Sequence, residues 1–144
     1  MSKSLLYRLF GLRKVPARAR ERLENEGIVF DEEGTSCALY YKNFRCSHKY
    51  SGRGWESLAV GSLVITRRSF YIQFPYMILC DKPVEDVVKY LELELKGPDK
   101  LVMKFEVEKI FEPSTGSLTC YWRTDNASAI FNHICDLQAN HAGC

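Results

Sequence analysis

The pattern of hydrophobic and polar positions predicts a chain that is mainly β. The clearest segment is 61–74, where apolar residues alternate with others on both sides of a short polar break at 66–69. Period-two alternation around such a break is typical of a hairpin in which one face of each strand is buried and the other faces solvent. Because the break holds no Asn-Gly pair, we expect a connection longer than two residues.

A second hairpin is predicted near the middle of the chain. Leu91, Leu93 and Leu95 alternate with charged residues, the segment 97–99 has turn chemistry, and alternation resumes over 101–107. Further strands are predicted at 28–30, 36–44, 77–80 and 117–124. The segment 36–44 is apolar on both faces, so we expect that strand to be covered on both sides.

The strongest helical pattern lies near the C-terminus, over 126–138, with Thr124 or Asp125 as its N-cap. Its apolar stripe comprises Ala127, Ile130, Phe131, Ile134 and Leu137. We expect Phe131 and Ile134 to be almost completely buried against the sheet.

Two shorter helices are predicted near the N-terminus. An amphipathic helix is expected over 4–11, and a charged helix over 17–25 that ends at Gly27. Together with roughly eight antiparallel strands and the C-terminal helix, these elements predict an α+β fold that is mainly β. We expect a basic helical arm at 1–26 and an antiparallel β-barrel or sandwich domain at 27–144, closed at one end by the last helix.

Composition narrows the class of protein. The chain has 144 residues, of which 46% are hydrophobic and 26% charged, as in a single globular domain with its own core. No apolar run reaches the length of about eighteen residues that spans a membrane, and no secretory cleavage site follows the basic N-terminus. We therefore expect a cytoplasmic protein whose six cysteines are free thiols.

The sequence shows no constellation that indicates catalysis. His48 has no acidic neighbour of the kind that a catalytic triad needs, and the three histidines do not combine with the cysteines at zinc-ligand spacing. We expect no enzyme activity, no catalytic residue, no metal, no cofactor and no small-molecule substrate.

Charge is distributed unevenly along the chain. Residues 1–22 hold seven basic residues against one acidic residue, a net +6; because the whole chain carries +2, the remainder carries −4. Such an arm contacts an anionic surface or docks on its own domain. The part that would enter a membrane interface comprises Leu5, Leu6, Arg8, Leu9 and Phe10.

Two further groups of basic residues are candidate anion or lipid sites. Arg67 and Arg68 lie in the polar break of the first hairpin, where an arginine can present its rigid donor fork. The second group comprises Lys42, Arg45, Lys49 and Arg53. Aromatic residues interleave with it, a combination that is also typical of single-stranded nucleic-acid binding. The alternative for both groups is an ordinary solvated surface, and for Arg67 and Arg68 also pairing with nearby carboxylates.

The segment 61–70, GSLVITRRSF, resembles the hairpin of bacterial pleckstrin-homology-like (PH-like) and GRAM-type domains. The predicted strands and the C-terminal helix extend the resemblance over roughly 27–138. It implies a barrel of two nearly orthogonal sheets that one helix closes, and a binding module that is not an enzyme. The basic residues that bind phosphoinositides on the first two strands of that family are not matched, since no Lys or Arg lies between Glu24 and Tyr41.

Three functions stay open at this point. The first is binding of a protein partner, or self-association through an uncovered strand edge. The second is peripheral binding to anionic lipid at the inner face of the membrane. The third is nucleic-acid binding through the basic and aromatic segment 42–55.

Overall fold

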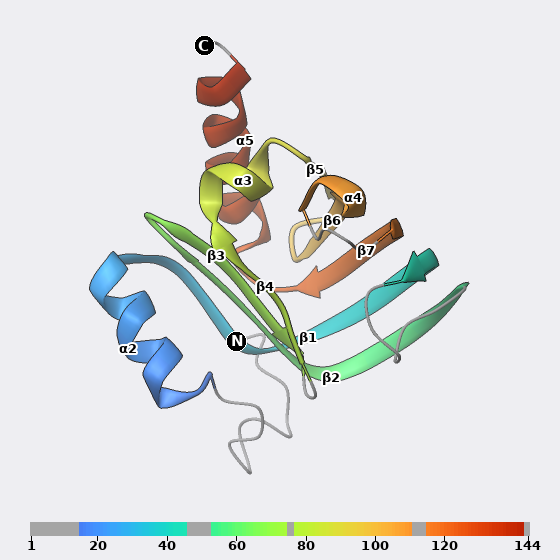
Figure 1. The fold of residues 1–144 in the computed structure, drawn as a ribbon, viewed down its shortest axis with the longest axis horizontal. Helices are drawn as coiled ribbons and strands as arrows, with labels where there is room; N and C mark the ends of the chain where they lie inside the picture. Colours follow the sequence, from blue (N-terminus) through green and yellow to red (C-terminus); the bar gives the residue numbers. More distant parts are fainter. Residues whose placement is uncertain (1–14, 46–52, 75–76, 111–114, 143–144) are drawn as a thin grey trace.

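The computed structural model describes residues 15–45, 53–74, 77–110 and 115–142 (Figure 1). For residues 42–45, 53–60, 77, 115 and 141–142 it describes the main chain alone. The strands are β1 (Ile28–Arg45), β2 (Arg53–Thr66), β3 (Ser69–Phe74), β4 (Met77–Pro83), β5 (Leu91–Leu95), β6 (Lys100–Glu106) and β7 (Thr115–Arg123). The helices are α2 (Ala17–Glu26), α3 (Val84–Val88), α4 (Val107–Ile110) and α5 (Ala127–Ala142).

The strands form one antiparallel sheet of seven strands in the order β4-β3-β2-β1-β7-β6-β5. The sheet curls into a half-barrel, and α5 packs on it (Figure 1). The predicted α+β class, mainly β, with a C-terminal helix and an N-terminal helix, is confirmed. β4 and β5 do not pair with each other, so the described sheet has two edges.

One predicted break in the chain is absent. The segments 28–30 and 36–44 belong to one strand, β1, which pairs with β2 from Ile28 to Lys42. Register shifts follow Ile28, Glu32 and Thr35, and Gly34 has φ +77°. These bulges absorb the extra residues of the polar stretch, so the strand bends there and does not end.

The connection between β2 and β3 is also shorter than predicted. Only Arg67 and Arg68 separate the two strands. The Thr66 hydroxyl accepts hydrogen bonds from the main-chain N–H groups of Arg68 at 3.0 Å and Ser69 at 2.7 Å. This side-chain oxygen closes the turn, so no Asn-Gly pair is needed.

The inner face of the curled sheet holds the main core. Core side chains on β2 and β3 include Leu63, Ile65 and Phe70, and on α5 Ala127, Ile130 and Ile134 are fully buried. Phe131 is only partly buried, so the expectation for it was wrong, whereas that for Ile134 is confirmed. Phe131 borders the buried stripe and does not lie at its centre.

The ends of two predicted segments are settled by local contacts. The Thr124 hydroxyl accepts from the N–H of Asn126 at 3.0 Å, so Thr124 is the capping residue of the two that were considered. The strand predicted over 101–107 ends at Glu106, because Val107 begins the single helical turn α4.

The outer face of the first hairpin is covered by α2 (Figure 1). Leu23 is fully buried with Val64 and Tyr71, which alternate along their strands with the inner core residues. The first hairpin is therefore buried on both faces, contrary to expectation, because a helix occupies its second face. The outer face of β1 at Ala38 and Tyr40 is half-buried, although we expected it to be covered.

Ion pairs add to this docking of α2. Arg20 contacts Asp31 at 2.7 Å and Glu33 at 2.6 Å. Burial acts to lower the pKa of Arg20, but the hydrogen bonds to Asp31 and Glu33 outweigh it and hold that pKa above its ordinary value. Arg20 and Arg22, which contacts Asp81 on β4 at 2.7 Å, both pair with the body of the protein, in agreement with the docking alternative for this part of the arm.

Replacing Leu23 by Ala should lower the free energy of unfolding by about 3 kcal/mol, because it leaves a cavity between α2 and the sheet. Urea unfolding measures this loss. Glu24→Ala, at an exposed position of the same helix, should change stability by less than about 0.5 kcal/mol and serves as the control. Equal stability of both variants would contradict the docking of α2.

Glu26 gives a prediction about pH. Burial acts to raise its pKa, but hydrogen bonds from Ser69 and Thr66 and the charges of Arg22 and Arg68 outweigh burial and lower it. A lowered pKa stabilises the fold above the carboxyl's ordinary pKa, and that contribution disappears as pH falls towards the lowered value. Glu26→Gln should therefore cost on the order of 1 kcal/mol at pH 7 and progressively less below about pH 4.5, measured by urea unfolding. An equal cost at pH 3 and pH 7 would argue against it.

Candidate functional site

The main-chain groups of β5 alternate between two directions. Glu106 donates its N–H to the Tyr90 carbonyl at 3.0 Å, and Lys96 donates to the Lys100 carbonyl at 2.9 Å. These bonds and the β5–β6 register place the even-numbered positions of β5 in hydrogen-bonded pairs with β6. The N–H and C=O groups of the odd-numbered positions therefore point away from β6, towards the edge of the sheet.

One of these outward groups already has a partner. The side-chain amide of Gln138, on α5, donates to the Leu91 carbonyl at 2.6 Å and to the Val88 carbonyl at 3.0 Å. The outward main-chain groups of Leu93 and Leu95 have no partner within the parts of the chain that the structure describes. The edge is thus anchored at its first residue and open at the next two outward positions.

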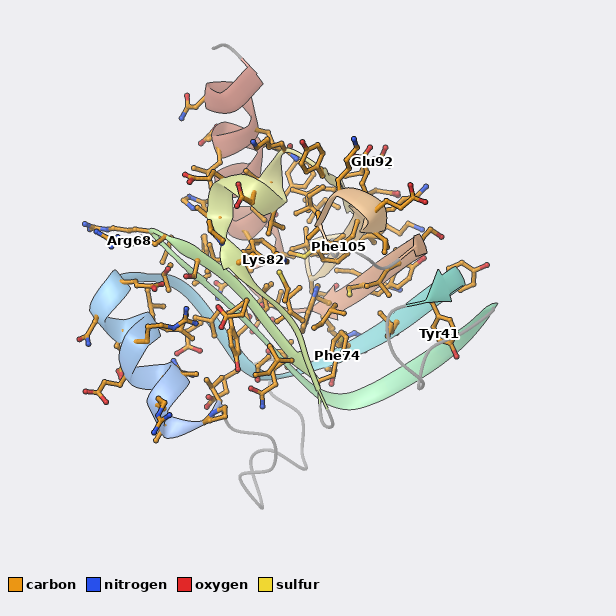
Figure 2. The ribbon with its side chains drawn as sticks, viewed as in Figure 1. Tyr41, Arg68, Phe74, Lys82, Glu92 and Phe105 are labelled. Atoms are coloured by element: carbon orange, nitrogen blue, oxygen red, sulfur yellow. The ribbon has the colours of Figure 1, made fainter. Side chains whose placement is uncertain are left out.

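The side chains of β5 differ on its two faces. Leu91 is buried in the core, whereas Leu93 and Leu95 are only partly buried against it. Glu92 and Glu94 alternate with them and are exposed. Figure 2 shows Glu92 at the margin of the molecule and Phe105, a core residue of the neighbouring strand, in the interior. The edge presents an apolar inner side and a charged outer side, on which Glu92 lies opposite Lys104 in the register and Glu94 lies 4.0 Å from Lys96.

The outer side of this edge continues into a hollow of about 460 Å³ on the sheet. Its lining includes Val102 with two glutamates and two lysines, Glu92, Glu94, Lys96 and Lys104, and the aromatic residues Tyr40 and Tyr121. The register explains this grouping, because Val102 lies between Glu94 on β5 and Tyr121 on β7. A ligand along β5 could therefore extend over aromatic and polar side chains.

The opposite edge, β4, has different chemistry. Its pairing with β3 is irregular between Ile72 and Gln73, and it ends at Pro83, which has no N–H. Bulges and prolines are the features that keep an edge strand from pairing with another chain. Ile78 on this strand is 51% exposed, but the irregular backbone does not offer a continuous row of hydrogen-bonding groups. β5 is thus the better candidate for strand pairing.

The structure separates the predicted basic residues. Arg67 and Arg68 are exposed at the turn that follows β2. Lys42 and Arg53 are register partners at the far end of the β1–β2 pair, with Arg45 beyond them. Their side chains, Lys49, and the arm residues Leu5, Leu6, Arg8, Leu9 and Phe10 lie outside the described residues. Lipid or nucleic-acid binding by those groups stays a prediction.

The buried cysteines do not form a reactive site. Cys37, Cys80 and Cys120 are buried free thiols, and Cys135 is a partly buried free thiol, as predicted. Burial raises the pKa of the Cys80 thiol to about 12 and that of the Cys37 and Cys120 thiols well above the ordinary value. At neutral pH these three buried thiols are protonated, so they are poor nucleophiles. No group of three or more metal-ligating side chains occurs among the residues for which side chains are described.

Comparison with known proteins does not assign the chain to a family. No protein-family model matches the chain, and no curated protein matches it. No helix in the described ranges is long and apolar enough to cross a membrane.

The sequence predicted the hairpin of β5 and β6 but did not single out β5 as a site. A signal was present, because two glutamates alternating with leucines on a strand of five residues are typical of a charged edge strand. Gln138, which anchors the strand to α5, had no comparable signal.

The direction of the β5 main chain gives a stability prediction. The register places the Glu94 N–H opposite the Val102 carbonyl, so Glu94→Pro removes a hydrogen bond of the sheet and should cost on the order of 2 kcal/mol. Leu93→Pro removes an outward N–H and should cost less, although Leu93 is the more buried side chain. Urea unfolding of both variants measures the order. The reverse order would show that odd-numbered positions pair with β6.

Proposed function

We propose that this chain is a non-enzymatic, PH-like interaction module that binds an extended segment of a protein partner along β5. The strand order and the C-terminal helix are consistent with the PH-like topology that the hairpin motif at 61–70 implies. The free thiols of Cys37, Cys80, Cys120 and Cys135 support a reducing compartment, the cytoplasm.

The observation that carries this proposal is the open edge of β5. Main-chain groups of Leu93 and Leu95 point outward, and an extended peptide that adds to such an edge satisfies them and gains affinity from the same bonds. The half-buried leucine side chains would become covered by the added strand, and covering apolar surface stabilises a complex by roughly 25 cal/mol per Å².

The charges of β5 indicate the chemistry of the partner segment. Glu92 and Glu94 project on the outer face, at positions where an added strand places its own alternate side chains. Opposite charges in directly facing cross-strand positions are favourable, and like charges are unfavourable. We infer a segment in which lysine or arginine alternates with apolar residues, the basic side chains facing the glutamates and the apolar ones facing Leu93 and Leu95.

The same charges disfavour self-association through this edge. Two antiparallel copies of β5 would bring Glu92 and Glu94 of one chain against those of the other. The β4 edge is interrupted by a register irregularity and ends in Pro83. A different protein therefore fits β5 better than a second copy does.

A titration with defined peptides tests the proposal. A short blocked peptide in which lysine alternates with valine should shift the amide resonances of Leu93 and Leu95. A peptide in which glutamate replaces each lysine should bind at least tenfold more weakly. The variant Glu92→Lys/Glu94→Lys should reverse this preference, since it replaces both negative side chains of β5 by positive ones without touching the main chain.

Two variants at one position provide the matched control. Leu93→Ala removes the side chain but keeps the outward N–H, so it should weaken binding partially. Leu93→Pro also removes the N–H and should weaken binding further. The proposal is wrong if the peptide shifts resonances elsewhere only, or if the charge-reversed variant keeps the original preference. Sedimentation that shows dimers in the absence of peptide, lost on Glu92→Lys/Glu94→Lys, would favour self-association instead.

A further inference from the structure

A second candidate site lies where the end of α2 meets the β2–β3 turn. Two adjoining hollows, of about 650 and 490 Å³, share Arg22, Arg67 and Arg68 in their linings. Arg18 on α2 completes the first hollow, and Lys82 on β4 completes the second. Figure 2 shows Arg68 extending outward from the end of the hairpin. Five cationic side chains from three separate parts of the chain therefore border one surface depression.

Most of these cations are not neutralised by the protein. Arg22 contacts Asp81 at 2.7 Å, and it also lies 3.8 Å from Glu26, so its single positive charge is shared between two carboxylates. In contrast, four side chains form no ion pair with any described residue: Arg18, Arg67, Arg68 and Lys82. The unpaired carboxylates in the lining are those of Glu21 and Glu85, which are exposed. The two hollows together hold five cationic side chains against four carboxylates, a net charge of +1, and the four cations without an ion pair to a described residue are available to an anionic ligand.

The turn that carries two of the arginines is held in place. Arg67 donates its N–H to the Gly27 carbonyl at 3.1 Å, and a Cβ at Gly27 would lie 3.3 Å from Cδ of Arg67. Gly27 has φ +88°, so glycine meets both the backbone and the space requirement there. Thr66 connects the turn to α2, because its hydroxyl donates to Glu26 at 2.9 Å. Both arginines therefore start from a fixed backbone, which reduces the entropy lost when they bind a ligand.

The chemistry of the lining points to the kind of anion. Guanidinium groups bind phosphate oxygens through two parallel N–H bonds, and a lysine adds a point charge. No aromatic side chain among the described residues lines either hollow, so nothing there would stack a nucleic-acid base. We propose that this hollow binds a terminal phosphate group, presented by a lipid headgroup or by a small soluble phosphate compound.

This site is independent of the proposed function. The residues of the two sites belong to different elements, and the hollow shares none with the β5 edge. Glu92→Lys/Glu94→Lys should therefore leave phosphate binding unchanged, and loss of phosphate binding should leave peptide binding unchanged.

Two probes test the proposal and separate the sources of phosphate. Inorganic pyrophosphate represents the soluble source, and phosphatidylcholine vesicles that contain phosphatidic acid represent the lipid source. Vesicles with phosphatidylserine at equal charge control for simple electrostatic attraction. The wild-type protein should bind pyrophosphate with shifts of the Arg67, Arg68 and Lys82 resonances, and a lipid source should add preferential binding to the phosphatidic acid vesicles. Pyrophosphate binding without that preference would assign the soluble source.

Variants decide whether the hollow is responsible. Arg67→Ser/Arg68→Ser should weaken binding of either probe at least tenfold, and Lys82→Gln should weaken it severalfold. Arg123→Ser, which removes an exposed arginine from β7, should have no effect. Urea midpoints should stay close to the wild-type value in all three, since these side chains are not in the core. The proposal is overturned if the wild-type protein binds neither probe, or if Arg123→Ser weakens binding as much as the double variant does.

Discussion

The structure depends on β1, which joins both halves of the sheet. Its eighteen residues pair with β2 along most of their length and with β7 from Cys37 onward. A strand of that length would end at its polar stretch if each residue had to keep register, but bulges around Gly34 let it bend and continue. With β1 at the centre of the strand order, β4 and β5 are left at the edges, and their chemistry decides how the sheet can be extended.

The two edges are protected in different ways, and this difference carries the functional argument. β4 is irregular and ends in proline, which makes pairing with any strand difficult. β5 keeps a regular backbone, and its exposed glutamates repel a strand that carries negative charge at the facing positions. Such an edge avoids pairing with itself while it accepts a segment of the opposite charge, which is specificity obtained by repulsion of the wrong partner.

The sequence predicted the fold class, both hairpins and α5, because their alternation or helical spacing is strong and local. It predicted α2 from the residues at its ends, Pro16 and Gly27. Prediction from the sequence failed where contacts between distant segments decide which side chains are buried or brought together. The apolar outer residues Val64 and Tyr71 are explained by Leu23, which lies more than forty positions earlier in the chain. Likewise, Arg18 and Lys82 join Arg67 and Arg68 only because α2 and β4 meet beside the turn. No pattern in a single segment contains that information.

The most direct test of the central claim is amide hydrogen exchange along β5. In the free protein, the amides of Leu93 and Leu95 should exchange rapidly, while those of Glu92 and Glu94, which the register pairs with β6, should be protected. Addition of the peptide that alternates lysine and valine should then protect Leu93 and Leu95. Equal protection of all four amides in the free protein, or no change at Leu93 and Leu95 when the peptide is present, would contradict the account of β5 as an open edge that a partner strand completes.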